Sequence, residues 1–281
     1  MVSKSIPINF CCLGPQRTAS SWLHEVLSCH PDVCLPDGVK ETMFFDDRFH
    51  KGLSWYTKLF RRQGARQVCG EIAPTYFHSV KACERLVELS PDLKIIILVR
   101  NPIERTFSLY RHHLSKGRIR IPFSQALERH PELIDTGKYS IHAKRWEDSF
   151  PPLNTMYLWQ DDIKQNPQKI LDDTCDFIGV KKIKIPPVAN EIVNTATAPR
   201  NAYVARILSA TATTLRSLAL HRVVNFGRSL GLKKMYEGGA TVQKLSNEQY
   251  RMLADLFEED LVWLEQRLGR KLDDWRYSMP C

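Results

Sequence analysis

Small hydroxyl side chains and one cation follow the first apolar stretch of the chain. Residues Ile8–Leu13 predict a strand, and residues 14–22 read Gly-Pro-Gln-Arg-Thr-Ala-Ser-Ser-Trp. A strand, a tight loop and a helix N-terminus form a phosphate cradle, because backbone N–H groups and the helix dipole face the anion. The hydroxyls add donors and Arg17 adds positive charge. The alternative is an ordinary N-cap at Thr18 on a core helix.

Two further segments carry charged groups. Arg100 follows the expected strand Lys94–Val99, and Ser108 lies about two turns into the next expected helix, so both can reach a second phosphate. Lys40 and Glu41 stand side by side before an aromatic pair. The alternative for this pair is two solvated charges on a surface loop.

The first loop differs from the nucleotide-triphosphate pattern. Ala19-Ser20-Ser21 stands where that pattern needs Gly-Lys-Ser or Gly-Lys-Thr. Arg100 occupies the strand end where an Asp would hold magnesium. We therefore expect a phosphate ligand held by protein cations, with no metal. A P-loop kinase-like phosphotransferase stays open only as an alternative.

Strands alternate with helices along the chain and predict a doubly wound α/β fold. Further strands are expected at residues 67–72, 94–99 and 155–159, and 94–99 has the continuous apolar run of a central parallel strand. Ligands bind at the carboxyl ends of such strands, where the charged segments fall. Helical apolar spacing occurs at residues 22–27, 103–114 and 170–178.

The C-terminal part is expected to be helical. Ser246–Gln249 has the form of a capping box, and apolar residues from Leu253 to Leu268 predict one long closing helix. Residues 181–245 are less regular and form a variable acceptor-side or lid region, with a helix expected over 200–220. No repeat or linker is visible, so we expect a single domain over residues 1–281: a P-loop-like central parallel sheet flanked by helices.

Composition excludes several classes of protein. The 281 residues are 43% hydrophobic and 25% charged, as in ordinary globular domains, which excludes disordered and fibrous chains. Apolar runs fall short of the ~18 residues that a membrane helix needs. The first residues lack the features of a signal peptide, and the eight cysteines form no Cys-x-x-Cys pair. We expect free thiols and a cytoplasmic location.

The net charge of +9 is unevenly placed. Residues 192–236 contain seven Lys or Arg, including Arg200, and no acidic residue. Such a block indicates an anionic partner: phosphate groups of a small ligand, nucleic acid or a membrane surface. A basic binding module for nucleic acid or membranes therefore stays open, as does a solvated face without a ligand.

Taken together, the three charged segments resemble the PAPS-dependent sulfotransferases, in the branch of heparan-sulfate-type and bacterial enzymes. In that family the first loop binds the 5′-phosphosulfate of PAPS, and an Arg-Asn-Pro…Ser segment, here Arg100 to Ser108, binds its 3′-phosphate. Further landmarks lie at residues 55–56, 70–77, 137–139, 163–180 and 268–275.

The resemblance implies a role for each matching position. Glu41 is the base, and Arg17 with Lys40 stabilises the departing 3′-phosphoadenosine 5′-phosphate (PAP). Arg100 and Ser108 hold the 3′-phosphate. The remaining contacts to PAPS fall on Thr18, Ala19, Ser20, Ser21, Trp22 and Arg200.

The acceptor is expected to be a small molecule, such as a secondary metabolite sulfated on a hydroxyl or nitrogen. Glycan-modifying members carry a histidine and a lysine where this chain has Met43 and Ile72, which argues against a carbohydrate polymer. A glycan sulfotransferase is the alternative. Five aromatic side chains are candidates to line the acceptor pocket, with plain core packing as their alternative role: Trp55, Tyr56, Tyr76, Phe77 and Tyr139.

Overall fold

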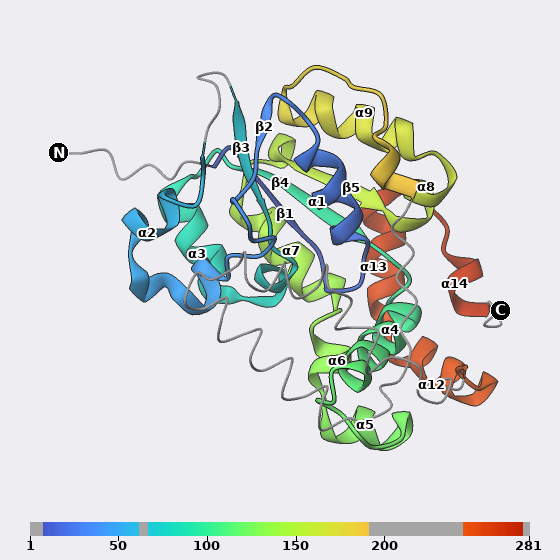
Figure 1. Ribbon diagram of the computed structural model, residues 1–281. Coiled ribbons are helices and arrows are strands. Elements are labelled where there is room, and N and C mark those ends of the chain that lie inside the picture. The colour runs from blue at the N-terminus through green and yellow to red at the C-terminus, as the bar shows by residue number, and fades with distance from the viewer. Residues whose placement is uncertain (1–7, 62–66, 191–243, 278–281) are drawn as a thin grey trace. The chain divides into compact units, whose positions relative to one another are not determined.

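The computed structural model describes residues 8–61, 67–190 and 244–277 and contains a five-stranded parallel sheet (Figure 1). The strand order is β2-β3-β1-β4-β5, which confirms the predicted α/β class. One short strand was not expected, because two residues are too few for a periodic pattern. The strands are β1 (Phe10–Leu13), β2 (Val33–Cys34), β3 (Val68–Ile72), β4 (Lys94–Val99) and β5 (Thr155–Trp159).

Strand β1 lies in the middle of the sheet, between β3 and β4. Cys11 pairs with Glu71 on β3 and with Ile95 on β4. The chain runs from β1 toward β2 on one side and later crosses to β4 on the other, so the strand order reverses at β1. In open parallel sheets this switch point, at the carboxyl end of the strands, is where ligands bind.

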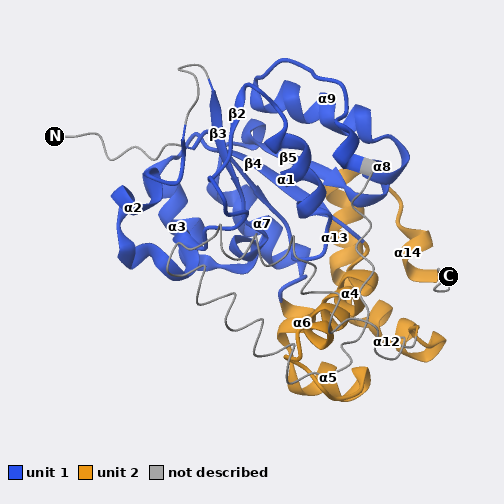
Figure 2. Cartoon of the chain, in the orientation of Figure 1, with its two compact units in different colours: residues 1–100, 136–193 blue, residues 101–135, 194–281 orange. Residues whose placement is uncertain are grey.

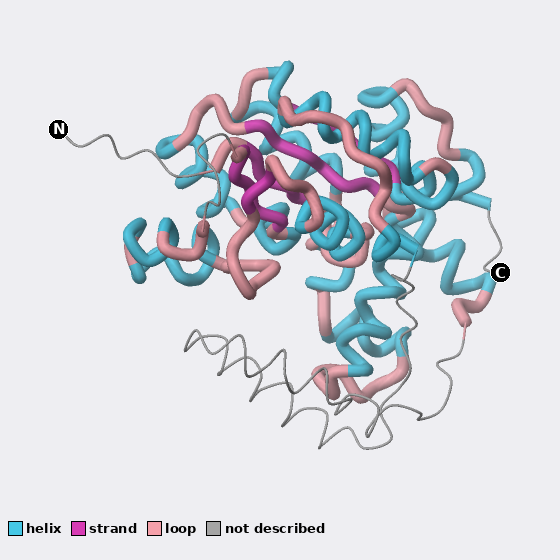
Figure 3. The backbone as a smooth tube through the Cα atoms, turned by 45° about the horizontal axis from the view of Figure 1, so that its top comes forward, coloured by secondary structure: helices cyan, strands magenta, loops and turns pink. Residues whose placement is uncertain are grey.

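The described residues divide into two compact units (Figure 2). The first unit spans residues 1–100 and 136–193 and holds the sheet, whose strands gather together in Figure 3. Its helices are α1 (Ser20–Ser28), α2 (Leu53–Thr57), α3 (Val80–Leu89), α7 (Tyr139–Ser149), α8 (Gln160–Gln165) and α9 (Pro167–Ile178).

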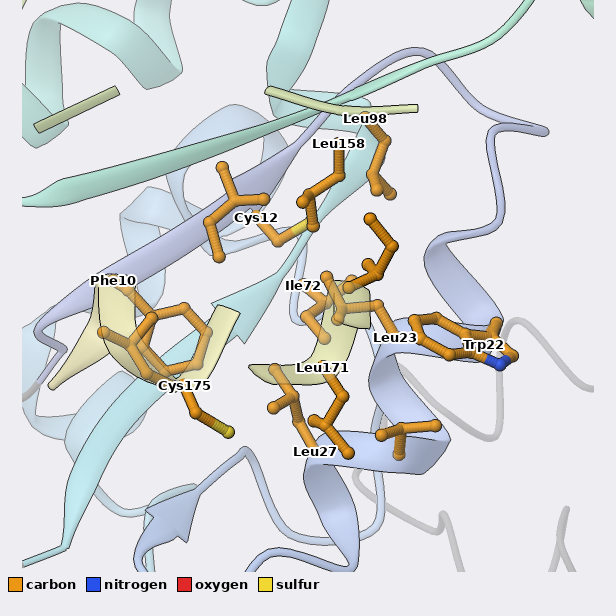
Figure 4. Close-up of a cluster of buried hydrophobic side chains, with 14 of the residues drawn as sticks. Phe10, Cys12, Trp22, Leu23, Leu27, Ile72, Leu98, Leu158, Leu171 and Cys175 are labelled. Carbon is orange, nitrogen blue, oxygen red and sulfur yellow. The ribbon is translucent and has the colours of Figure 1, made fainter. Parts of the chain in front are cut away.

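One face of the sheet packs against α1, α8 and α9 (Figure 4). Alternate strand residues such as Phe10, Cys12 and Leu98 point to this face, as the two-residue period of a strand requires. They meet Leu23 of α1 and Leu171 of α9, all of them fully buried. Right-handed crossovers then place α3 and α7, which contact each other, on the opposite face. The core on the first face, which includes Leu23, holds the start of α1 at the carboxyl end of β1.

The second unit spans residues 101–135 and 194–281, and the regular elements of its described part are helices. Ile103 and Leu109 pack there against Leu133, Leu253 and other apolar side chains. The helices are α4 (Pro102–Ser115), α5 (Phe123–Arg129), α6 (Glu132–Asp135), α12 (Asn247–Leu256), α13 (Glu258–Leu268) and α14 (Asp273–Tyr277).

The prediction of one long closing helix was wrong. The capping box at Ser246 is present, but the helix ends at Leu256 and α13 begins at Glu258. In a straight helix, a stripe of apolar side chains spaced four residues apart drifts around the helix axis, because four residues exceed one turn of 3.6. The break at Phe257 returns the stripe to the buried face, and Phe257 and Leu261 are both fully buried.

Two expectations fall on residues that the structure does not describe. The helix expected over residues 200–220 and the basic block at 192–236 lie outside the described ranges, as does Arg200. Within the described ranges, none of the helices has both the length and the apolar character needed to cross a bilayer.

Candidate phosphate-binding and catalytic site

The loop after β1 has the tight curl that a phosphate cradle needs. Gly14 has φ +119°, and a Cβ there would lie 2.8 Å from the backbone N and O of Leu98, so only glycine fits. Arg17 and Ala19 both adopt left-handed conformations, with φ of 80° and 72°. These turns deliver the chain directly into α1 at Ser20.

The N-terminus of α1 has no side-chain cap. The Thr18 hydroxyl donates to the carbonyl of Pro15 at 2.7 Å, and Ala19 occupies the cap position. The alternative of Thr18 as an ordinary N-cap was therefore wrong. Helix geometry leaves the first amides of α1 without intrahelical acceptors, so this end of the helix favours an anion.

Lys40 connects two of the predicted segments. Its Nζ donates to the hydroxyls of Ser20 at 3.0 Å and Ser21 at 3.3 Å, and to Oε1 of Glu41 at 3.1 Å. The side chains of Lys40 and Glu41 are 25% and 28% exposed. The pair is thus shielded at the start of α1, unlike two solvated charges on a surface loop.

Arg100 connects the third segment to the first. Its Nη1 donates to the main-chain carbonyl of Arg17 at 2.9 Å. The Tyr139 hydroxyl accepts from the Arg100 amide at 3.0 Å and donates to the Arg100 carbonyl at 3.2 Å. The end of β4 is therefore fixed beside the loop that follows β1.

Other predicted PAPS contacts are placed differently. Ser108 lies half-buried on α4, in the second unit, whereas Arg100 belongs to the first. Their shared contact with a 3′-phosphate stays a prediction. The Trp22 side chain is buried in the core against the sheet. A ligand at the start of α1 would therefore meet the backbone of Trp22 and not its side chain.

Four of the five aromatic candidates for the acceptor pocket are fully buried: Tyr56, Tyr76, Phe77 and Tyr139. Trp55 retains partial exposure, with the Lys51 ammonium 4.8 Å from its ring centroid. The buried hydroxyls are satisfied by internal partners, as buried polar groups require. Contact with the acceptor stays a prediction for all five.

Glu71 is a residue of this region that the sequence analysis did not assign. It is fully buried on β3 and accepts from the Thr42 amide and the Tyr56 hydroxyl, each at 2.8 Å. The Tyr76 hydroxyl lies 3.3 Å from both of its oxygens. Burial raises the pKa of Glu71 to about 7, although these hydrogen bonds act to lower it. The only sequence signal was its place in the landmark at residues 70–77.

The charges of the site favour a polyanion. Lys40, Arg17 and Arg100 come from three loops, and the end of α1 adds its dipole. Among the described residues, no group of three or more His, Cys, Asp or Glu side chains has the arrangement of a metal site. Glu41 stands beside Lys40 with a carboxylate able to accept a proton. The arrangement is therefore suited to group transfer from a phosphate-linked donor.

Comparisons with known proteins agree with this chemistry. A family model described as "Sulfotransferase domain" matches residues 8–199. Heparan sulfate glucosamine 3-O-sulfotransferase 3B1 of Mus musculus is 34% identical over 181 residues, which are 61% of this chain and 46% of that protein. The human bifunctional heparan sulfate N-deacetylase/N-sulfotransferase 3 is 27% identical over 192 residues, with coverage of 61% and 22%.

The chain thus matches less than half the length of these curated relatives. A sulfotransferase from Alicyclobacillus acidocaldarius has the same fold, with a TM-score of 0.70 at 21% identity over 96% of this chain and 99% of that one. Since the family model covers more than half of the residues, including the loops that hold Arg17, Lys40 and Arg100, the chain belongs to the sulfotransferase family.

Proposed function

We propose that this protein transfers a sulfuryl group from PAPS to a hydroxyl or nitrogen of a small-molecule acceptor. The observation that carries the proposal is the position of Lys40, which contacts both the hydroxyls that open α1 and the carboxylate of Glu41. A phosphate-binding element and a proton acceptor are thereby joined by one cation.

The residues present fit the 5′ end of PAPS. Backbone amides at the start of α1 and the hydroxyls of Ser20 and Ser21 supply donors, and Lys40 supplies charge. Arg100, at the end of β4, is our candidate for the 3′-phosphate, together with Ser108 and Arg200. PAPS supplies the sulfuryl group when bound and leaves as PAP.

Glu41 is proposed as the general base. Its carboxylate accepts the proton that the acceptor hydroxyl or amine loses during attack. Lys40 and Arg17 stabilise the negative charge that grows on the bridging oxygen of the departing phosphate. Because this charge is met by side-chain cations and by amides, the mechanism requires no metal from the protein.

A glycan acceptor is the second candidate. It is favoured by the 34% identity to a heparan sulfate glucosamine 3-O-sulfotransferase. Two positions argue for the small molecule. Met43 lies two residues after Glu41, where the glycan enzymes carry a histidine, and the fully buried Ile72 follows Glu71, where they carry a lysine. The seven cysteines among the described residues are free thiols, which supports the cytoplasmic location that we also propose.

The proposal is tested with PAPS labelled on sulfur. The protein is incubated with small alcohols, phenols and amines in one set of reactions and with desulfated heparan oligosaccharides in another, and labelled product and PAP are both quantified. We expect label in the small-molecule set. Label in oligosaccharides alone would support the second candidate, and absence of PAP binding by calorimetry would refute both.

A further inference from the structure

A buried carboxylate lies one hydrogen bond from the segment that carries Glu41. Oε1 of Glu71 accepts the amide N–H of Thr42 at 2.8 Å, and this amide belongs to the peptide bond that joins Glu41 to Thr42. Because the peptide group is planar, its orientation sets the direction of the chain at Glu41. Glu71 is 29 residues away in sequence and fully buried, so it does not contact the reacting groups.

Tyr76 extends this contact into a clamp. Its hydroxyl donates to Glu71 and accepts the amides of Phe44 at 2.9 Å and Phe45 at 3.2 Å. The Thr42 hydroxyl lies 3.1 Å from the same oxygen. Groups at the end of β3 therefore hold the backbone from residue 42 to residue 45, immediately after the proposed base.

The clamped segment includes a strained residue. Met43 has φ 55°, a left-handed conformation that is sterically unfavourable for a residue with a Cβ. Such a conformation persists only where surrounding contacts determine it. The hydrogen bonds to Glu71 and Tyr76 on either side of Met43 are contacts of this kind, so their loss would allow the segment to relax.

We propose that Glu71, as a carboxylate, is a positioning residue for the reaction: through Thr42 and Tyr76 it holds the Lys40–Glu41 segment in the geometry that proton removal requires. This inference rests on the proposed role of Glu41 as the base. It adds a residue that touches neither PAPS nor the acceptor.

The donors around Glu71 select its ionised form. Thr42, Tyr56 and Tyr76 each donate to it, and a protonated carboxyl would have to turn one oxygen into a donor. The Tyr76 oxygen already accepts two backbone amides. Burial opposes the charge and raises the pKa of Glu71 to about 7. The carboxyl at the centre of the clamp therefore gains or loses its proton near neutral pH.

The other titratable groups near this carboxyl come from several elements. Tyr56 faces it from α2, Tyr76 from the turn after β3 and Cys11 from β1. Burial raises the pKa of all three well above its ordinary value, so each stays neutral near pH 7. The Arg48 guanidinium donates to the Thr42 carbonyl at 3.2 Å. Glu71 is therefore the group of this network that titrates near neutrality.

The test compares the pH dependence of kcat in wild type and Glu71→Gln. We expect the wild-type kcat to fall below about pH 7, and the variant to be at least about tenfold slower at pH 8 with no such fall near pH 7. The affinity for PAP, measured by calorimetry, should change by less than about twofold. An unchanged kcat, the same acid limb in the variant, or a parallel loss of PAP affinity would each overturn the proposal.

Tyr56→Phe removes one hydrogen bond to Glu71 while keeping the ring, so it provides a second test should Glu71→Gln fold poorly. Tyr157→Phe is its matched control, because Tyr157 on β5 donates to Glu147 at 2.7 Å. We expect only Tyr56→Phe to lower kcat and to shift the acid limb. Glu41→Gln is measured in parallel: if it abolishes turnover while the Glu71 and Tyr56 variants behave like wild type, only this inference fails, whereas full activity of Glu41→Gln removes the proposed base itself.

Discussion

The guanidinium of Arg100 donates a hydrogen bond to the main-chain carbonyl of Arg17 at 2.9 Å. This contact joins the loop after β1 to the end of β4, two neighbouring strands that are separated by more than 80 residues. The two proposed phosphate-binding segments are therefore in direct contact with each other. The segments that would bind the 5′ and 3′ ends of PAPS support each other through this hydrogen bond.

Replacing Arg100 should affect the 3′-phosphate most. Charged hydrogen bonds contribute ~1.5–3 kcal/mol each, so Arg100→Ala should weaken PAP binding by roughly 10–100-fold. The loss for AMP, which lacks the 3′-phosphate, should be much smaller. Calorimetry with both nucleotides measures the difference, with Arg251→Ala, an exposed cation on α12, as the control. Equal losses for PAP and AMP would show that Arg100 supports the loop and not the phosphate.

Replacing Glu41 should affect turnover and not binding. General-base catalysis typically contributes ~10²–10⁴-fold, so Glu41→Gln should lower kcat by about that factor. The amide oxygen of Gln can still accept from Lys40, so PAP affinity should stay near the wild-type value. Steady-state kinetics and calorimetry measure the two effects, and Glu25→Gln, at an exposed position on α1, is the matched control. Turnover near the wild-type rate would exclude Glu41 as the base.

Turnover should not depend on a metal. Phosphotransferases of the P-loop type use magnesium held by a hydroxyl and a carboxylate. At this site the Lys40 ammonium contacts Ser20, the Arg100 guanidinium contacts the Arg17 carbonyl, and Arg17 adds a third positive charge to the loop, so these charges would repel a metal cation. PAP formation with a competent acceptor should therefore persist after exhaustive chelation with EDTA. A loss of activity that magnesium specifically restores, with PAPS shown to be intact, would contradict the mechanism.

Glycine at position 19 should stabilise the protein. Ala19 has φ 72°, a conformation that costs a residue with a Cβ roughly 1–2 kcal/mol. The extra backbone entropy of glycine in the unfolded chain offsets part of the gain, so Ala19→Gly should raise the free energy of unfolding by about 0.5–1 kcal/mol. Urea denaturation measures it. Ala82→Gly, within the right-handed helix α3, should instead destabilise by about 1 kcal/mol, and the same sign for both variants would contradict the strain argument.

Stability should fall as pH rises toward neutrality because of Glu71. The pKa of this carboxyl is about 7 in the folded protein and near its ordinary value of 4.5 when unfolded. Between these values the folded state binds more protons, so stability decreases with rising pH. At about 1.4 kcal/mol per pH unit, the loss attributable to Glu71 is about 3 kcal/mol and is complete above about pH 7.

Glu71→Gln cannot titrate, so it isolates this contribution. The free energy of unfolding of wild type minus that of the variant should decrease from pH 4.5 to pH 7 and then become constant. Denaturant unfolding at a series of pH values measures the difference, in which the other titrating groups cancel. A difference that does not change with pH would mean that Glu71 keeps an ordinary pKa in the folded state. Together with the clamp, the expected result would mean that the ionised form serves activity at a cost in stability.

Local patterns predicted much of the fold. The bounds of β4 and β5 match the expected strands, because each is a run of apolar residues between polar ends. The family resemblance assigned Lys40 and the loop after β1 to the same ligand, and the structure puts the Lys40 ammonium on Ser20 and Ser21; the role of Lys40 in the reaction stays a prediction. The Phe257 break was not visible, because Phe257 continues the apolar spacing and its turn is set by packing.

The Glu71 network could not be predicted from spacing. Its donors lie 29, 15 and 5 residues from Glu71, on separate elements, and a carboxylate in sequence is ordinarily a surface group. Likewise, Thr18 had the residue type of an N-cap, but the left-handed turn at Ala19 moved the cap position by one residue. In both cases the decisive partner is chosen by the three-dimensional path of the chain and not by local preference.

The two hydrogen bonds between Tyr139 and the backbone of Arg100 also act on the chain path. The first unit ends its first segment at Arg100 and resumes at Thr136, so Tyr139 ties the exit point to the re-entry point. The intervening 101–135 stretch is thereby a closed loop, whose closure entropy depends only weakly on its length. The tie at Tyr139 therefore holds the strand end that presents Arg100 whatever the length of the stretch, whereas Ser108, the partner proposed for the same phosphate, lies on α4 inside it and depends on the fold of the stretch itself.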